Sequence, residues 1–246
     1  MIIKSNRINP FDLDLWYELE NADRVRQVSK KKILASLDSI KQFLSTGSAY
    51  VGVSWGKDSV VAAYLVRQID SRIPLNNLRC TNRNPDCDAV RDAYLSMFPS
   101  EYHEIKVDYA HCHAKNLPVD ELDKITDRIW YDGIDESERR FGKRHILGIR
   151  ADESHGRKMR CRLWGHSSPN GCAPLAWWNT EDVFAYLSQY DLPVHPAYAM
   201  LGGGRWPRNR IRTAEIGDTH GTSGGRAEWE REYYGDVLNK LGAAIQ

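Results

Sequence analysis

The stretch Ala49-Tyr50-Val51-Gly52-Val53-Ser54-Trp55-Gly56-Lys57-Asp58-Ser59 carries the strongest structural signal in this sequence. Its first five residues form a short apolar run, which is typical of a strand buried on both faces. A glycine-bearing turn follows, and residues 60–69 are apolar enough for a buried helix. A strand, a glycine-bearing turn and a helix in this order predict the first unit of a nucleotide-binding α/β domain.

The turn between this strand and this helix has the composition of an anion site. A turn at a helix N-terminus presents free backbone N–H groups and the positive end of the helix dipole. Gly56 allows the backbone to approach a ligand closely, and Lys57 adds a positive charge. The hydroxyls of Ser54 and Ser59 can donate hydrogen bonds. Asp58 either caps the helix N-terminus or helps to hold a magnesium ion on bound phosphates.

Two common phosphate-binding patterns do not match this turn. A Walker A loop needs a glycine where Val51 stands and a serine or threonine where Asp58 stands. The dinucleotide-binding pattern of three spaced glycines is absent as well. The alternative without a ligand is a solvated turn in which Lys57 and Asp58 are surface residues.

Further strands and helices alternate along the rest of the chain. Helical spacing predicts helices over residues 13–19, 24–44, 86–97, 120–129, 180–188 and 226–241. Short apolar runs predict strands over residues 78–81, 103–107 and 145–149. This alternation predicts an α/β fold with a mainly parallel twisted sheet flanked by helices and a loop-rich C-terminal region. We divide the chain into an N-terminal helical segment (1–46), a nucleotide-binding domain (47–200) and an Arg/Gly-rich loop with a C-terminal helix (201–246).

Composition and charge narrow the class of protein. The chain of 246 residues has 34 Lys and Arg against 33 Asp and Glu, a net charge of +1, with 41% hydrophobic residues. These values are typical of a soluble globular protein, and they exclude a generally basic nucleic-acid coat. No apolar run approaches the roughly 20 residues of a membrane span, and residues 1–10 lack the apolar centre of a signal peptide. We therefore predict a cytoplasmic protein that does not bind a membrane.

The cysteines do not indicate a disulfide framework or a metal cluster. Their number is odd and small: Cys80, Cys87, Cys112, Cys161 and Cys172. No C-x-x-C pair occurs, so we predict no iron–sulfur cluster and no closely spaced zinc site. The triplet at residues 111–113, His-Cys-His, is a weak candidate for metal ligands, and ordinary thiols are the simpler interpretation.

Arginines gather in two places. Arg150 directly follows the strand at 145–149, so it lies at the carboxyl edge of the sheet, where α/β ligands bind. Arg157 is one helical turn from Glu153, so it is either a phosphate contact or one half of a surface ion pair. Arg160 belongs to the dense basic run that follows this proposed site.

The second cluster follows three consecutive glycines. It contains Arg205, Arg208, Arg210 and Arg212. With Trp206 among them, these arginines predict phosphate contacts beside a stacking surface, a combination that suits single-stranded or flipped nucleic acid. A solvent-exposed loop is the alternative. Further along, residues 221–226 form either a second anion nest or a linker.

Three motifs in the same order resemble one superfamily. Residues 54–59 are similar to the PP-loop Ser-Gly-Gly-Lys-Asp-Ser of the ATP pyrophosphatases, with Trp55 in place of one glycine. Residues 147–157 and 174–198 are similar to the Gly-Ile-Arg-x-x-Glu-Ser-x-x-Arg and Pro-Leu-x-x-Trp motifs of its phosphoadenosine-phosphosulfate (PAPS) reductase-like branch. The resemblance implies an adenine nucleotide alpha hydrolase-like fold that binds an adenine nucleotide at the carboxyl end of its sheet.

The resemblance also implies site residues and a reaction. It assigns nucleotide binding to Ser54, Trp55, Gly56, Lys57, Asp58, Ser59, Gly148, Arg150 and Arg157, of which Lys57, Asp58 and Arg150 are the catalytic candidates and Asp58 the magnesium candidate. Members of the superfamily use ATP and Mg²⁺, attach AMP to an unreactive oxygen and release pyrophosphate. A nucleophile then displaces AMP, which is a better leaving group than the original oxygen.

The chain departs from the reductases of this branch. Those enzymes carry a C-terminal Glu-Cys-Gly-Ile-His, whereas no cysteine follows Cys172 here, so sulfate reduction is disfavoured. Relatives that retain ATP activation include the ATP pyrophosphatases of DNA phosphorothioate modification, which work with a cysteine desulfurase and other modification proteins. We therefore expect adenylation of a DNA backbone phosphate before sulfur is incorporated. The candidate DNA contacts are Arg160, Arg205, Arg208, Arg210 and Arg212.

Several alternatives remain open at this point. The acceptor could be transfer RNA or a small molecule rather than DNA. The chain could instead be a nucleotide-binding subunit without turnover, because Trp55 alters the loop, or a sulfonucleotide reductase with an unfamiliar cysteine. Cys161, between two arginines, is either a sulfur relay with a lowered thiol pKa or a buried structural thiol.

Overall fold

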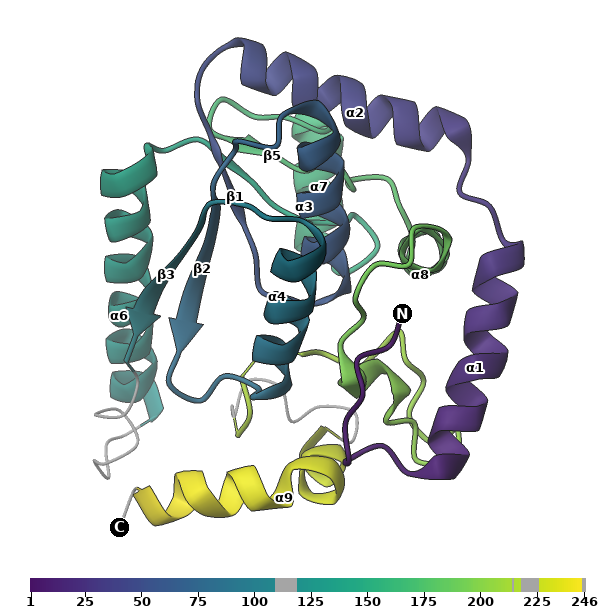
Figure 1. Ribbon diagram of the computed structural model, residues 1–246. Helices are drawn as coiled ribbons and strands as arrows, with labels where there is room; N and C mark the ends of the chain where they lie inside the picture. The colour runs from purple at the N-terminus through teal and green to yellow at the C-terminus, as the bar shows by residue number, and fades with distance from the viewer. Residues whose placement is uncertain (109–118, 214, 218–225, 245–246) are drawn as a thin grey trace.

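The computed structural model describes residues 1–108, 119–213, 215–217 and 226–244. In these ranges the chain forms one five-stranded sheet in the order β3-β2-β1-β4-β5, and every pair of neighbouring strands is parallel (Figure 1). The strands are β1 (Tyr50–Gly52), β2 (Leu75–Cys80), β3 (Tyr102–Val107), β4 (His145–Ile146) and β5 (Gly171–Cys172). The predicted α/β fold with a mainly parallel sheet is confirmed.

Helices connect the strands and cover the sheet. They are α1 (Pro10–Val25), α2 (Lys30–Ser45), α3 (Lys57–Ile69), α4 (Asp86–Met97), α6 (Val119–Phe141), α7 (His155–Trp164), α8 (Thr180–Gln189), the short 3-10 helix η1 (Pro196–Ala199) and α9 (Arg226–Ala244). Helix α6 packs on β2 and β3, whereas α3 packs on β1 and also contacts α2 and α8. Figure 1 shows α6 on one side of these strands and α3 with α4 on the other.

The strand order creates a crevice at the middle of the sheet. From β1 the chain moves outward through β2 to β3, and then returns to place β4 and β5 on the other side of β1. The connections therefore diverge between β1 and β4, and ligands of open α/β sheets bind at the carboxyl ends of such a pair of strands. The loop after β1 is residues 53–56, and the loop after β4 includes Arg150.

Some elements differ from the sequence prediction. Helix α2 begins at Lys30 rather than at residue 24, because the chain is extended at Arg26 and Ser29 between α1 and α2. The unpredicted α7 is rich in basic residues and has one buried side chain, Cys161, so it lacks the apolar periodicity that identifies a helix. Strand β5 has two residues, too few for a pattern.

The largest of three hydrophobic clusters in the described ranges includes residues from the N-terminal, central and C-terminal parts of the chain. This cluster of buried apolar side chains includes Trp16 of α1, Val51 of β1, Phe184 of α8 and Trp229 of α9. The predicted N-terminal, central and C-terminal parts therefore share their core. Within the described ranges, no helix combines the length and the apolar composition that crossing a lipid bilayer requires.

Candidate functional site

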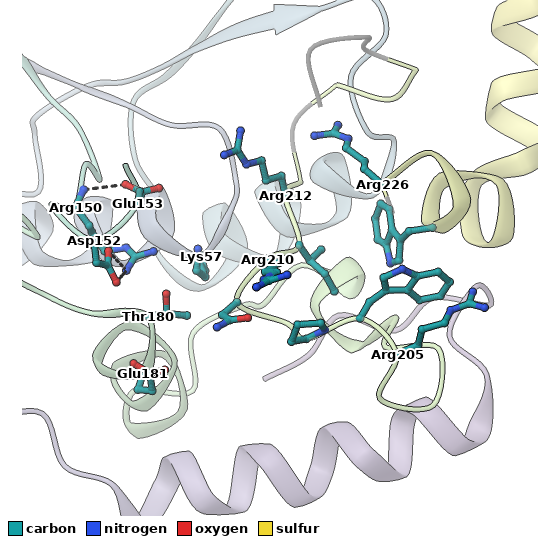
Figure 2. Close-up of a pocket in the computed structure, with 15 residues that line it drawn as sticks. Lys57, Arg150, Asp152, Glu153, Thr180, Glu181, Arg205, Arg210, Arg212 and Arg226 are labelled. Carbon is teal, nitrogen blue, oxygen red and sulfur yellow. Dashed lines mark hydrogen bonds and ion pairs between the residues drawn. The ribbon is translucent and has the colours of Figure 1, made fainter. Parts of the chain in front are cut away.

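A cleft with a volume of about 610 Å³ opens at the crevice between β1 and β4. Its cationic lining residues are Lys57, Arg150, Arg205, Arg210, Arg212 and Arg226. The acidic ones are Asp152, Glu153 and Glu181. Figure 2 shows Arg150 and Asp152 at one end, Arg205 at the other, and Lys57 and Arg210 between them. A cleft with more cations than carboxylates suits an anionic ligand.

The loop after β1 is held in shape by its own hydrogen bonds. The backbone N–H of Ser54 donates to Oγ of Ser59 (3.2 Å), and that hydroxyl donates to the carbonyl oxygen of Gly56 (3.0 Å). The N–H of Lys57 donates to the hydroxyl of Tyr198 (3.3 Å). A Cβ on Gly56 would lie 2.8 Å from Oγ1 of Thr213, so only glycine fits at this position.

Gly148 lets the loop after β4 pack directly on the start of α3. A Cβ at this position would lie 2.6 Å from the backbone carbon and oxygen of Asp58. Any side chain here would separate the two loops that border the crevice. Gly148 therefore shapes the site through close backbone packing.

Asp58 lies between the two buried cations at one end of the cleft. Its Oδ2 accepts a hydrogen bond from Nζ of Lys57 (2.7 Å), and its Oδ1 is 2.6 Å from Nε of Arg150. Arg150 also donates from Nη1 to both oxygens of Asp152 (2.6 and 2.7 Å). The side chains of Lys57 and Arg150 are only 7% and 3% exposed, so these charges are shielded from water.

Both cations keep their charge in this environment. Burial lowers the pKa of Lys57, but the hydroxyl of Tyr198 and the carboxylate of Asp58 outweigh burial and raise the pKa overall. Burial likewise lowers the pKa of Arg150, and the neighbouring carboxylates, that of Asp58 first, raise it overall. The end of the cleft therefore holds two charged cations that share Asp58, and Arg150 is paired with Asp152 as well.

Asp58 does not cap α3, which was one of its two sequence interpretations. The N-cap of α3 is Gly56, without a side-chain cap, and both Asp58 oxygens face cations rather than open space. In the part of the chain that the structure describes, no three or more Asp, Glu, His or Cys side chains form a group that could hold a metal. These residues therefore do not form a complete protein site for a resident magnesium ion, and the prediction that Asp58 helps to hold Mg²⁺ on bound phosphates stays a prediction.

The predicted arginines of α7 lie apart from the cleft lining. Arg157 is exposed and pairs with Glu153, so it forms the surface ion pair that was one of its two predicted roles. Arg160 lies beside the start of β5, where a Cβ on Gly171 would be 3.4 Å from its Nη2. The cleft lining does not include Arg160.

The four arginines of residues 205–212 form two groups: Arg205 and Arg208 pair with carboxylates, whereas Arg210 and Arg212 have no such partner among the described residues. Arg208 donates to both oxygens of Asp23 (2.6 and 2.8 Å) and lies 4.1 Å from the ring centre of Phe184, so it is committed to the protein interior. Arg205 pairs with Glu232 and stacks on Trp206 at 3.7 Å. Arg210 and Arg212 line the cleft, are exposed, and have no carboxylate partner within the described residues.

The predicted stacking surface of Trp206 is not available to a nucleic acid. Its side chain is 8% exposed and packs edge-on against Tyr233, with ring centres 5.9 Å apart. Gly202, in the left-handed region at φ 56°, turns the chain back on this indole, and a Cβ there would lie 2.3 Å from the ring. Trp206 therefore packs mainly within the protein and stabilises the loop, although it contributes to the cleft lining.

The described cysteines are all buried. They are Cys80, Cys87, Cys161 and Cys172. Burial raises the pKa of the Cys87 thiol to about 11 and also raises that of Cys172. Cys161 is a buried thiol, as the simpler interpretation held. The candidate triplet at residues 111–113 and the candidate nest at residues 221–225 lie outside the described residues.

Sequence reasoning missed two residues that complete the loop. Tyr198 is fully buried, contacts the Lys57 backbone, and its ring centre lies 5.5 Å from Nζ of Lys57. Tyr198 is the last residue of the motif over residues 174–198, and this motif was the sequence signal that could have identified it. Thr213 crowds Gly56 from the C-terminal segment, and no local pattern marks it.

Comparison with known proteins agrees with this architecture. Residues 48–223 match the family model of the phosphoadenosine phosphosulfate reductase domain. A phosphoadenosine 5'-phosphosulfate reductase of Alkalilimnicola ehrlichii is 21% identical over 243 residues, which are 88% of this chain and 96% of that protein.

Two solved structures share the fold. The PAPS reductase of Candida auris, solved as a phosphate complex, superposes with a TM-score of 0.52 at 15% identity over 79% of this chain and 98% of its own. The NMN synthetase of Francisella tularensis superposes with a TM-score of 0.52 at 13% identity, over 89% of this chain and 94% of its own. At these identities the two structures show a common fold and no more.

Proposed function

This chain belongs to the phosphoadenosine phosphosulfate reductase domain family, and from that premise we propose that it is an ATP pyrophosphatase. In the proposed reaction a phosphate oxygen of a DNA backbone attacks the α-phosphorus of ATP. The bond between the α-phosphorus and the bridging oxygen to the β-phosphorus breaks, and pyrophosphate leaves with that electron pair. AMP is then attached to the acceptor oxygen, which a sulfur nucleophile can subsequently displace together with AMP.

The single observation that carries this proposal is the Lys57–Asp58–Arg150 arrangement at the start of α3. Negative charge develops on the α-phosphate and on the leaving pyrophosphate as the bond breaks. We propose that the two buried cations beside a helix N-terminus stabilise that charge, with the phosphate taking over part of their pairing with Asp58. Because both side chains are shielded from water, their interaction with a phosphate is stronger than that of surface cations.

The acceptor side of the proposal rests on Arg210 and Arg212. These two cleft cations have no carboxylate partner in the described ranges, so they are available to the phosphates of a second anionic substrate. Because Trp206 is buried, the contact we propose is to the charged backbone rather than to stacked bases. We propose that sulfur comes from a partner such as a cysteine desulfurase, since the four described cysteines are buried.

A second candidate function is sulfonucleotide reduction. The family match and the reductase of Alkalilimnicola ehrlichii favour it. The buried cysteines oppose it, because that reaction needs an accessible thiolate and the pKa of Cys87 is raised to about 11. Cys112 lies outside the described residues, so variants of this cysteine belong in the test.

The test is to incubate the protein with α-labelled ATP, magnesium and either DNA, transfer RNA or no acceptor. We expect AMP and pyrophosphate, with release accelerated by DNA. ATP binding without release of AMP and pyrophosphate would favour a nucleotide-binding subunit without turnover. Acceleration by transfer RNA but not by DNA would show that transfer RNA, rather than DNA, is the acceptor. Thioredoxin-dependent sulfite formation from PAPS, lost in Cys112→Ser, would establish the reductase instead.

A further inference from the structure

Trp55 has a backbone conformation that normally belongs to glycine. Its φ is 64°, in the left-handed region, where a bulky side chain is strained. It is one of two non-glycine residues with positive φ in the described ranges, the other being Asp191. A strained residue persists only where its surroundings compensate, so the contacts of this indole are informative.

The side chain of Trp55 is buried on the face of the loop away from the cleft. It is 0% exposed, and its ring centre lies 5.6 Å from that of Tyr94 on α4 and 5.5 Å from that of Tyr102 on β3. Its Nε1 donates to the hydroxyl of Tyr102 (3.3 Å). Trp55 does not line the cleft, so the indole anchors the loop from behind.

The anchor continues into a network of charges. Tyr102 donates to a carboxylate oxygen of Glu104 (2.6 Å), and Glu104 accepts hydrogen bonds from Arg79 and Arg91 (3.2 and 3.0 Å). Burial and the bond to Glu104 raise the pKa of Tyr102 to about 12, so its hydroxyl stays protonated and can both accept and donate. The phosphate-binding loop is thereby tied to β2, β3 and α4.

We propose that Trp55 is a positioning residue that holds the loop at residues 54–59 in its phosphate-binding shape before a ligand arrives. This inference deepens the proposed function and rests on it for the identity of the ligand. A loop that is ordered in advance loses less conformational entropy when it binds. Trp55 therefore acts on the affinity of the loop for phosphates and not on the bond-breaking step.

Hydrogen exchange tests the anchor without any ligand. We expect the backbone amides of residues 53–60 to exchange about tenfold faster in Trp55→Gly than in the natural protein, because the loop opens locally. Tyr102→Phe keeps the ring and removes the hydroxyl, and it should give a smaller increase of about threefold. Trp178→Phe is the matched control, since Trp178 is equally buried but donates to Ser36 of α2. If the amides of residues 53–60 exchange at the same rate in the natural protein and in Trp55→Gly, Trp55 does not anchor the loop. If Trp55→Gly does not fold, the exchange rates of Tyr102→Phe decide the question.

Binding of inorganic pyrophosphate, followed by calorimetry, links the anchor to the site. We expect about tenfold weaker binding by Trp55→Gly, with KM for ATP raised by a similar factor and kcat unchanged. If the loop amides of Trp55→Gly exchange faster but its affinity for pyrophosphate is unchanged, the order of the loop does not determine phosphate binding. If the natural protein itself binds neither pyrophosphate nor ATP, the proposed function fails, while the exchange rates still decide whether Trp55 anchors the loop.

Discussion

The Asp58 carboxylate pairs with two buried cations at the end of the cleft, one of which, Arg150, also pairs with Asp152. Lys57 begins α3 and Arg150 follows β4, so Asp58 joins two elements as well as two charges. Removing one member of a buried ion network leaves the others unpaired in a poorly hydrated place, and this costs more than the network itself contributes. An incoming phosphate group can provide the same negative charge, so ligand binding and the Asp58 interactions are coupled.

We predict that Asp58→Asn lowers the free energy of unfolding by about 3 kcal/mol, since Lys57 loses its carboxylate partner and Arg150 keeps only Asp152. Urea unfolding measures the change, and added pyrophosphate should restore part of it. Asp70→Asn is the control, because Asp70 pairs with the exposed Arg72 at the surface and should cause a much smaller change. Asp58→Asn unfolding at the same urea concentration as the natural protein would contradict the bridge.

Lys57 itself should determine turnover. We predict that Lys57→Ala lowers pyrophosphate release from ATP by about 100-fold, since one preorganised charge in the site is lost. The measurement is release of labelled pyrophosphate under saturating ATP, with circular dichroism to establish that the variant is folded. Lys31→Ala, an exposed lysine of α2, should keep full activity. Turnover that survives in Lys57→Ala would place the reaction elsewhere.

At the scale of elements, the segment of residues 202–212 combines arginines that pair with carboxylates and arginines that have no carboxylate partner among the described residues. Asp12 accepts hydrogen bonds from the backbone N–H groups of Gly202 and Gly203 (3.2 and 2.8 Å). These bonds fix the glycine turn that precedes the arginines. Arg208 then points to Asp23 of α1, whereas Arg210 lines the cleft. One short segment is thereby both attached to the fold and turned towards the site.

This division predicts opposite phenotypes for neighbouring arginines. Arg210→Ala and Arg212→Ala should each weaken DNA binding and reduce its salt dependence by about one unit of slope, with unchanged stability. Arg208→Ala should instead lower the free energy of unfolding by about 3 kcal/mol, because it leaves the buried Asp23 unpaired. Binding titrations at several salt concentrations, together with urea unfolding, separate the two effects. Equal losses of stability in all three variants would remove Arg210 and Arg212 from the proposed acceptor site.

At the scale of the whole molecule, His195 makes stability depend on pH. Its ring is fully buried, and Nδ1 accepts a hydrogen bond from the backbone N–H of Ala197 (3.1 Å). Burial, helped by the charge of Arg83, lowers the pKa of His195 from 6.5 to about 3. Below pH 6.5 the unfolded chain therefore binds a proton that the folded chain does not, so this histidine costs stability as the pH falls from 6.5 towards 3.

We predict that His195 accounts for a loss of about 2 kcal/mol of unfolding free energy between pH 7 and pH 5. His195→Asn keeps an acceptor for the Ala197 N–H and does not titrate, so its stability should change less over the same range. Urea unfolding of both proteins at the two pH values measures the difference. The same loss in both proteins would assign the acid sensitivity to other groups.

The sequence alone determined the α/β fold and indicated the sheet edge at which the candidate site lies. Both depend on local patterns: an apolar strand, a glycine-bearing turn and a helix around Gly56, and an arginine in the loop after β4, which ends at Ile146 rather than at the predicted residue 149. Parallel strands bring their carboxyl ends to one edge, so Gly56 and Arg150 had to meet there. No distant contact is needed for these conclusions.

Only the tertiary structure decided which charges are free. Asp58 takes Arg150 as a partner from another loop, Arg208 takes Asp23 from α1, and Trp206 is buried against α9. The reason is physical: the state of a charge or an aromatic ring depends on which remote side chains fold against it. A local pattern of arginines around a tryptophan is the same whether a carboxylate from a distant helix meets them or a ligand does.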